Sequence, residues 1–440
     1  MKQLKRAVKG VGLLVLCVCF ALIYVHPLLI PLSLTFLALF IWLVIRPASI
    51  ENSSKRLKHI YYALELLSSY AWSIVLEIPF LIILPRISHI PLYGMIVYSV
   101  ARLMTGAVIM IVSVIRLAVA SARLGIITRI VLLLMWWIPV INIIVIIRAC
   151  TTAGREYELE TQRNELFDVR KENEICKTKY PILMVHGVFF RDTKYLNYWG
   201  RIPRELIRNG AEIYYGNQQS ASSIKDSARE LMIRIKQITE ETGCGKVNII
   251  AHSKGGLDSR YAISVLGGDQ YVASLTTVNT PHRGCAFADH LLGKMPSFIK
   301  NFVAFNYNRT LRRLGDKSPD FLAAVDDLTQ ERCFLFNEAV HDKEGVFYQS
   351  IGSKMRSKKG AKFILRFTYS LVKKYSSPIN DGLVDVDSMR WGHSFELIQP
   401  KSKRGISHGD MIDLLREDIP DFDVREVYVQ IVQGLKARGM

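Results

Sequence analysis

The sequence predicts an α/β fold with a mostly parallel central sheet flanked by helices, preceded by an all-α domain of transmembrane helices. Two observations carry this prediction. Long apolar stretches fill the first third of the chain, whereas short apolar runs that end in turn signals begin near residue 180. Charged residues mixed with scattered Leu and Phe separate the two parts. We therefore expect a transmembrane helical domain over 1–150, a charged linker helix over 151–179 and an α/β domain over 180–440.

The composition agrees with a membrane protein that has cationic flanks. Half of the 440 residues are hydrophobic, yet the formal net charge is +18, a combination that is rare in soluble globular proteins. Nucleic-acid binding is the alternative, but no zinc-finger spacing, RNA-binding signature or basic heptad run accompanies the charge. We therefore expect no nucleic-acid partner. The seven cysteines are irregularly spaced and predict neither a disulfide framework nor a metal site.

The apolar stretches predict about five membrane spans, and they run over 11–46, 60–84, 92–117 and 126–147. The first is broken at His26-Pro27, which suits two short spans joined by a tight turn. Each of the last two is long enough, at about 1.5 Å rise per residue, to cross a hydrocarbon core of about 30 Å. A cleaved signal peptide is the alternative for the first helix, but no small-residue cleavage site precedes the next apolar run, so we expect that helix to be retained.

Charged residues predict how the spans are oriented. One predicted face of the membrane collects the basic residues Lys2, Lys5, Arg6, Lys9, Arg46, Lys55, Arg56, Lys58, Arg116 and Arg123. By the positive-inside rule this face is cytoplasmic, so five crossings would make the α/β domain extracytoplasmic. Glu65, Glu77 and Arg102 lie within spans, where a charge marks a path or a pair, although a helix-packing contact explains them equally well.

Two apolar runs lead into turns that suit nucleophilic catalysis. The run at 181–185 (PILMV) has the length of a buried strand and stops at His186-Gly187, an arrangement that an oxyanion hole requires. The run at 246–251 (KVNIIA) leads into Ser253, after which a helical pattern begins. Ala251 and Gly255, two residues before and after the serine, are small enough for a tight elbow. A plain helix start is the alternative, but the position directly after a strand favours a serine nucleophile.

An attacking serine needs a base and an orienting acid, which follow it in this kind of fold in the order Ser, Asp, His. Asp381 lies in a loop signal (NDGLV) that leads into an apolar run, and Asp385 and Asp387 remain alternatives. His408 lies between a charged loop and a helical segment, and only His393 competes with it in chain order.

From 180 to about 415 the sequence resembles the bacterial triacylglycerol lipases of the Pseudomonas and Burkholderia type, which have the α/β-hydrolase fold. The motifs that carry the resemblance fall in the family's order: YPILMVHGVFFRD at 180–192, KVNIIAHSKGG at 246–256, VNTPHRGCAFAD at 278–289, NDGLV at 380–384 and SHGD at 407–410. Nothing in that family corresponds to the predicted spans.

The resemblance implies the role of each site residue. Ser253 would be the nucleophile, His408 the general base and then acid, and Asp381 the group that orients the imidazole. The backbone N–H groups of Val188 and Lys254 would form the oxyanion hole. Many of these lipases hold a structural calcium ion beside the catalytic histidine loop. Asp410 matches one of its ligands, but the sequence offers no convincing second ligand, so we expect no cofactor.

The expected substrate is a lipid ester presented at the bilayer. The resemblance places a lid near 282–330, and residues 291–314 mix apolar and basic residues as in a helix that lies on lipid, or in an ordinary core helix. A basic region, made of Lys354, Arg356, Lys358, Lys359, Lys373 and Lys374, would attract anionic headgroups. The alternatives are an acyltransferase, a thioesterase or a phospholipase with the same triad, and a non-catalytic membrane scaffold that keeps the fold.

Overall fold

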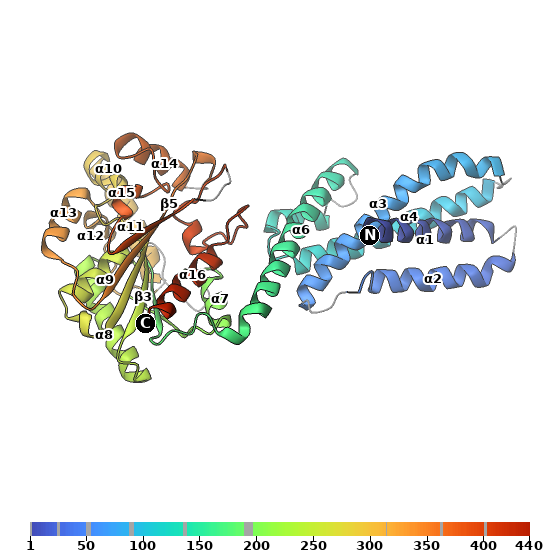
Figure 1. Ribbon diagram of the computed structural model, residues 1–440. Helices are drawn as coiled ribbons and strands as arrows, with labels where there is room; N and C mark the ends of the chain where they lie inside the picture. The colour runs from blue at the N-terminus through green and yellow to red at the C-terminus, as the bar shows by residue number, and fades with distance from the viewer. Residues whose placement is uncertain are drawn as a thin grey trace. The chain divides into compact units, whose positions relative to one another are not determined.

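The structure is a computed structural model that describes residues 2–23, 27–49, 54–87, 92–134, 139–188, 197–313, 315–360, 364–399 and 403–440. The chain divides into two compact units, Met1–Leu166 and Phe167–Met440 (Figure 1). This division falls within the predicted charged linker of 151–179.

The first unit is a helical bundle. Its helices are α1 (Lys2–Leu22), α2 (Ile30–Ile45), α3 (Lys55–Ile87), α4 (Leu92–Ala120), α5 (Ile126–Leu134) and α6 (Pro139–Arg170), which continues into the second unit, with the short 3-10 helix η1 (Pro27–Leu29) before α2. Apolar side chains of α1, α3 and α4 form its core, Leu13, Leu66 and Ile109 among them. Three largely buried ion pairs join these helices: Glu65 with Arg6, Glu65 with Lys9, and Glu77 with Arg102.

The predicted number of spans is not supported. Among the described residues, α4 is the single helix that is long and apolar enough, by length and composition, to cross a membrane. Helix α2 is apolar but shorter. Of the stretch 126–147, the structure describes α5 as far as Leu134 and α6 from Pro139 onward. His26 and residues 135–138 lie outside the described residues.

The second unit is built on a six-stranded sheet. The strands lie in the order β2-β1-β3-β4-β5-β6, and every neighbouring pair is parallel. They are β1 (Ile182–Val185), β2 (Ile213–Tyr215), β3 (Val247–His252), β4 (Val272–Val278), β5 (Phe347–Ser353) and β6 (Ser394–Ile398). Parallel strands need crossover connections, and all the crossovers here contain helices or 3-10 turns.

Helices cover both faces of the sheet because its strands are apolar on both sides. Along β1, Ile182 and Met184 pack toward α7 (Ile202–Arg208) and α16 (Val424–Ala437), whereas Leu183 and Val185 pack toward α8 (Ile224–Thr242) and α9 (Lys254–Ser264). Figure 1 shows the sheet between these two helix layers.

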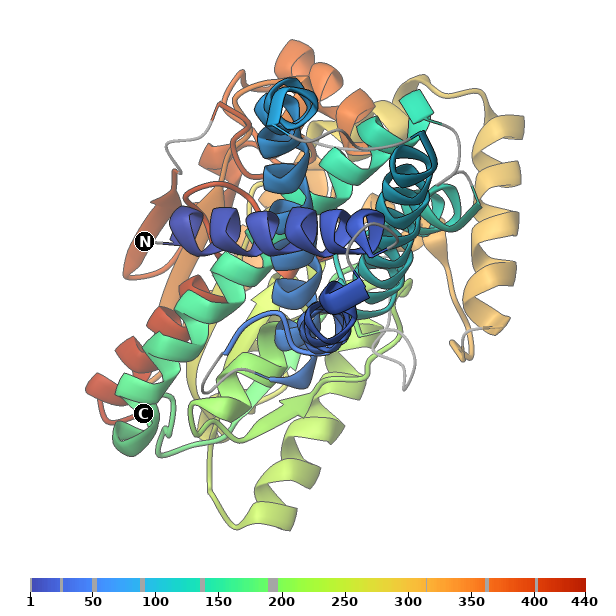
Figure 2. The same cartoon turned by 90° about the vertical axis from the view of Figure 1, so that its right-hand side faces the viewer.

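The remaining helices lie in the crossovers around β5. Between β4 and β5 come α10 (Ala286–Lys294), α11 (Ser297–Arg313), α12 (Phe321–Asp326) and α13 (Gln330–Ala339), and between β5 and β6 come α14 (Ile364–Tyr375) and α15 (Val386–Met389). The short 3-10 helices are η2 (Lys171–Asn173), η3 (Gly268–Gln270), η4 (Lys358–Gly360) and η5 (Asp410–Ile412). The predicted lid region of 282–330 therefore contains three helices, of which α11 is a rod at the margin of the unit (Figure 2).

Candidate active site

Ser253 occupies a tight elbow between β3 and α9. Its backbone has φ 55° and ψ −133°, a conformation that costs a non-glycine residue free energy and that clusters at functional sites. The elbow closes only around small neighbours. A Cβ atom added to Gly255 would lie 2.5 Å from the carbonyl oxygen of His186. Strand, elbow and helix therefore push the Ser253 side chain out beyond the carboxyl edge of the sheet.

The turn after β1 lies directly against this serine. A Cβ atom added to Gly187 would lie 2.7 Å from the Cβ atom of Ser253. Val188, whose backbone N–H is one predicted oxyanion donor, is the next residue along this turn. Lys254, which would supply the second donor, is the first residue of α9, and the first N–H groups of a helix have no partner within the helix. Residues 189–192 of the same motif lie outside the described residues.

His408 and Asp381 form a buried pair. The Nδ1 atom of His408 lies 2.6 Å from Oδ2 of Asp381, and the Asp381 side chain is fully buried. The backbone N–H groups of Leu383 and Val384 donate to its other oxygen at 2.8 Å. Asp385 instead caps α15 by accepting from Ser388 N–H, so of these two carboxylates only Asp381 contacts the histidine.

The imidazole of His408 lies beside the elbow. Its centroid is 4.5 Å from that of His252, the residue before Ser253. The described contacts of Ser253 and His408 do not include a hydrogen bond between them, and such bonds are often long or absent before substrate binds. His393, the competing histidine, stacks on Phe347 at the start of β5 instead, so the structure does not bring it to the serine.

The titratable side chains of His252 and Asp258, in the segment around Ser253, are buried. Burial lowers the pKa of His252 well below its ordinary value, and the neighbouring His408 lowers it further. One turn after Lys254 in α9, burial raises the pKa of Asp258 to about 7, although the ammonium group of Lys254 opposes this shift from 2.6 Å. The Lys254 side chain also donates to Ser227 at 3.1 Å. The side chain of Lys254 is thus engaged within the protein, which leaves its backbone N–H as the group offered to the site.

Asp410 does not present a calcium site. Both of its carboxylate oxygens accept hydrogen bonds from Arg404, at 2.7 and 3.1 Å. Within the part of the chain that the structure describes, no three His, Cys, Asp or Glu side chains come together as metal ligands would. The residues around Asp410 therefore do not fit calcium.

Sequence reasoning missed Asn279, which follows β4. Its side-chain amide donates to Oδ2 of Asp381 at 2.7 Å and to Ser353 Oγ at 2.8 Å. Asn279 therefore helps to hold this carboxylate oriented toward His408. The sequence placed Asn279 within a motif, but no spacing rule connects it to a carboxylate 102 residues away.

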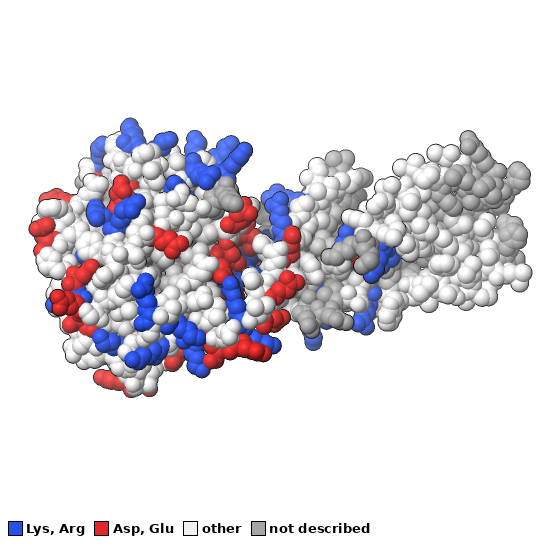
Figure 3. Space-filling view, viewed as in Figure 1, with Lys and Arg blue, Asp and Glu red and all other residues white. Residues whose placement is uncertain are grey.

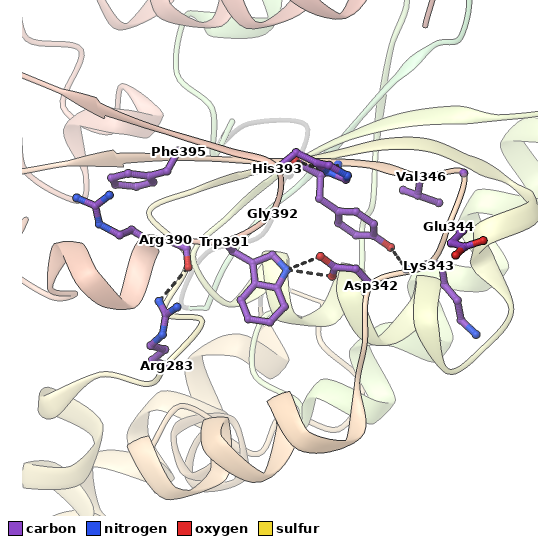
Figure 4. Close-up of a pocket in the computed structure, with 12 residues that line it drawn as sticks. Arg283, Asp342, Lys343, Glu344, Val346, Arg390, Trp391, Gly392, His393 and Phe395 are labelled. Carbon is purple, nitrogen blue, oxygen red and sulfur yellow. Dashed lines mark hydrogen bonds between the residues drawn. The ribbon is translucent and has the colours of Figure 1, made fainter.

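A separate pocket of about 830 Å³ lies at the opposite edge of the sheet (Figure 4). Tyr348 and His393 line it where β5 and β6 begin, and the indole N–H of Trp391 donates to Asp342 at 3.0 Å. Because Ser253 lies after the carboxyl end of β3, this pocket is not part of the candidate active site.

The parallel sheet with helices on both faces and the serine elbow after β3 define an α/β-hydrolase. Over 239 residues the chain is 32% identical to a triacylglycerol lipase of Vibrio cholerae serotype O1. This match covers 49% of this chain and 75% of that protein. The chain therefore belongs to the triacylglycerol lipase family, whose members are carboxylic-ester hydrolases.

Other comparisons cover less of the known proteins or have lower sequence identity. Triacylglycerol lipases of Pseudarthrobacter phenanthrenivorans and Burkholderia plantarii are each 36% identical over 172 residues, or 36% of this chain. The chain spans about half of their length, 53% and 48%. The crystal structure of Staphylococcus hyicus lipase has 19% identity and a TM-score of 0.48, covering 59% of this chain and 96% of that one. No family model matches the chain.

Proposed function

We propose that this chain is a membrane-tethered serine hydrolase that cleaves carboxylic esters of lipids through an acyl-enzyme. The observation that carries the proposal is the 2.6 Å contact between His408 and the buried carboxylate of Asp381, beside the elbow that presents Ser253. A buried carboxylate at this position holds the imidazole in the tautomer that accepts a proton at Nε2.

The proposed reaction has two steps. In the first, His408 Nε2 takes the proton of Ser253 Oγ as this oxygen attacks the ester carbonyl, and the proton then passes to the departing alcohol. The N–H groups of Val188 and Lys254 would stabilise the oxyanion, and removal of one such donor typically costs roughly 3 kcal/mol. In the second step, His408 takes a proton from water, which attacks the acyl group and restores Ser253.

Two surface features of the catalytic unit support a lipid substrate. Helix α11 exposes Phe298, Phe302 and Phe305, which lie four and three residues apart and therefore share one face. The basic region at the ends of η4 and α14 is largely exposed. Figure 3 shows Lys and Arg gathered along the edge of the catalytic unit where α14 lies. An exposed apolar face and a cationic region on one unit suit a bilayer with anionic headgroups.

Membrane attachment is proposed to occur through the first unit. Helix α4 has 29 residues, more than the length that a hydrocarbon core of about 30 Å requires. Exposed apolar side chains cover α2, α3 and α4, among them Trp42, Ile78 and Leu103, and apolar surface on this scale marks a contact with lipid or protein. With five crossings the catalytic unit would be extracytoplasmic, a proposal that protease protection of intact cells tests.

Labelling with a fluorophosphonate probe tests the nucleophile directly. We expect the wild-type chain to be modified at Ser253, and Ser253→Ala to lose both labelling and hydrolysis of p-nitrophenyl esters. Asp381→Asn should fold normally and lower kcat by about 10³- to 10⁴-fold. Ser264→Ala is the matched control, because this serine lies at the far end of the same helix, about 15 Å away along α9.

Retained ester hydrolysis by Ser253→Ala would refute the assignment, and an inert wild-type chain would favour a scaffold that only keeps the fold. Product analysis with triacylglycerol, phospholipid vesicles and thioesters, with and without an alcohol acceptor, separates a lipase from a phospholipase, a thioesterase or an acyltransferase.

A further inference from the structure

The loop that carries His408 is fastened by a guanidinium group. Asp410 lies two residues after His408. Arg404 Nη1 donates to Oδ2 of Asp410 at 2.7 Å, and Nη2 donates to Oδ1 at 3.1 Å. The two bonds run from one planar fork to one carboxylate, which is the strongest and most directional geometry that Arg offers.

The same carboxylate closes the turn that contains His408. Ser407 donates to Oδ2 of Asp410 through its backbone N–H and through its hydroxyl, each at 2.7 Å. His408 lies between these residues, and its own backbone N–H donates to the carbonyl oxygen of Asp381 at 2.9 Å. The position of the imidazole therefore depends on how Asp410 is held.

Arg404 also joins the two ends of this loop. Its Nη2 atom donates to Glu417 Oε2 at 3.0 Å, so one cation lies between two carboxylates that are seven residues apart. The Asp410 side chain is only 7% exposed. A nearly buried carboxylate without a cationic partner would be costly, which makes Arg404 the group that permits this arrangement.

A second fork holds the next turn of the loop. Arg201 donates to the two oxygens of Asp413 at 2.6 and 2.7 Å, and the Asp413 side chain is almost fully buried. Arg201 directly precedes α7. The segment from Arg404 to Glu417 is therefore fixed at several points by arginine–carboxylate bonds.

These contacts leave no place for the calcium ion that the resemblance suggested. Calcium binds six to eight oxygens at 2.3–2.6 Å, whereas the oxygens of Asp410 already accept N–H and O–H donors. Among these donors, the guanidinium group of Arg404 brings a positive charge to Asp410, as a divalent cation would.

We propose that Arg404 is a positioning residue that takes the place of a divalent cation, so that the loop presents His408 to Ser253 without calcium. The inference rests on the proposed function, because it concerns the base of that reaction. It adds the prediction that the site is insensitive to chelators and depends on one guanidinium.

The test compares the full chain with Arg404→Ala, Arg404→Lys and the matched control Arg416→Ala, an exposed arginine of the same loop. Fluorophosphonate labelling rate and Tm are measured with EDTA, with calcium and with methylguanidinium. We expect EDTA to change neither quantity for the wild type. Arg404→Ala should label at least 10-fold more slowly and recover in part with methylguanidinium, Arg404→Lys should be intermediate, and Arg416→Ala should match the wild type.

Several results would overturn the inference. Inactivation of the wild type by EDTA with recovery in calcium would show a metal site. Labelling of Arg404→Ala at the wild-type rate would show that the contact between Arg404 and Asp410 does not position His408. If Arg404→Ala does not fold, the Arg404→Lys variant decides. A fluorophosphonate labelling rate that neither the lysine side chain nor added methylguanidinium restores would contradict a role for the positive charge at position 404. If the wild type does not label, the proposed function fails. The Tm values alone then test whether Arg404 stabilises the loop through Asp410 without calcium.

Discussion

His252 connects the nucleophile to its surroundings. Its Nδ1 atom lies 2.7 Å from the hydroxyl of Tyr198, which accepts a hydrogen bond from Gly187 N–H at 3.1 Å. Its ring also packs against His408. The turn after β1, the elbow at Ser253 and the ring of His408 are therefore linked through one buried imidazole, so a change in the charge of His252 reaches all three.

The pH dependence of stability should reveal this residue. Because burial lowers the pKa of His252 in the folded chain, the unfolded chain binds a proton first as the pH falls below about 6.5. The stability that neutral His252 contributes is present above pH 6.5 and is lost below it, by up to about 1.4 kcal/mol per pH unit. His252→Asn should remove this part of the acid sensitivity.

Urea unfolding at pH 7.5, 6.5 and 5.5 measures the effect. The exposed His341 provides the control variant His341→Asn, which should keep the pH dependence of the wild type. An equal loss of stability in the wild type and in His252→Asn between pH 6.5 and 5.5 would contradict the prediction.

Residues close in sequence were easier to predict than contacts made by folding. Ser253 was identifiable because its elbow is encoded in five consecutive positions, and the structure places it after β3 as the pattern requires. Asp381 and His408 were predicted from order and resemblance, and the structure brings them together. Asn279 and Arg404 act through side-chain contacts that no local period records, so the sequence alone could not reveal them.

At the scale of single elements, α11 has two different faces. Ala304 and Leu311 are buried on one side, and Tyr307 packs against Phe321 of α12 with ring centroids 4.9 Å apart. Phe298 and Phe302 are 74% and 69% exposed on the other. The two expectations for this stretch, a core helix and a lipid-facing helix, thus describe opposite faces of one helix.

Phe298→Ser combined with Phe302→Ser should separate lipid binding from chemistry. Exposed substitutions change folding stability little, but each lost phenylalanine would remove about 1.5–3 kcal/mol of insertion into lipid. We expect hydrolysis of emulsified or bilayer esters to fall by roughly 100-fold or more, while soluble p-nitrophenyl butyrate is hydrolysed at the wild-type rate.

Phe334→Ser on α13 is the matched control, because Phe334 is 63% exposed on another helix of the same crossover. It should leave both activities unchanged. A double variant that loses both activities equally, or neither, would show that the exposed face of α11 does not contact the substrate surface.

The parallel sheet and its elbow could be predicted because apolar runs and turn signals are local. The helices of the first unit were predicted less well. Hydropathy predicted about five membrane spans, whereas among the described residues α4 alone is long and apolar enough to cross a membrane. Apolar composition predicts burial in some medium, but the points where a helix ends depend on packing that hydropathy does not contain.

At the scale of the whole molecule, two units of different chemistry share one chain. The first exposes apolar helices and buries its ion pairs, such as Glu77 with Arg102, whereas the second has an apolar core and charged surfaces. Charges that face the interior of a helix bundle are usual where the exterior meets lipid. The chain should therefore partition with membranes.

Carbonate extraction of membranes tests this expectation. We expect the wild-type chain to stay in the pellet at pH 11. Ile111→Lys combined with Ile115→Lys, both at exposed positions of α4, should release much of it, because each lysine costs about 2.5–3.5 kcal/mol at the centre of a span. The control Ile207→Lys, on the exposed face of α7 in the catalytic unit, should remain in the pellet, and a soluble wild-type chain would contradict membrane attachment.

The backbone at Ser253 has a consequence for the history of such chains. Its φ of 55° is a conformation that glycine adopts without strain. A descendant released from selection for chemistry would gain stability by exchanging this serine for glycine. In such a lineage, glycine would replace Ser253 while the rest of the elbow stayed unchanged. This single substitution would be an early sign that a hydrolase has become a binding protein.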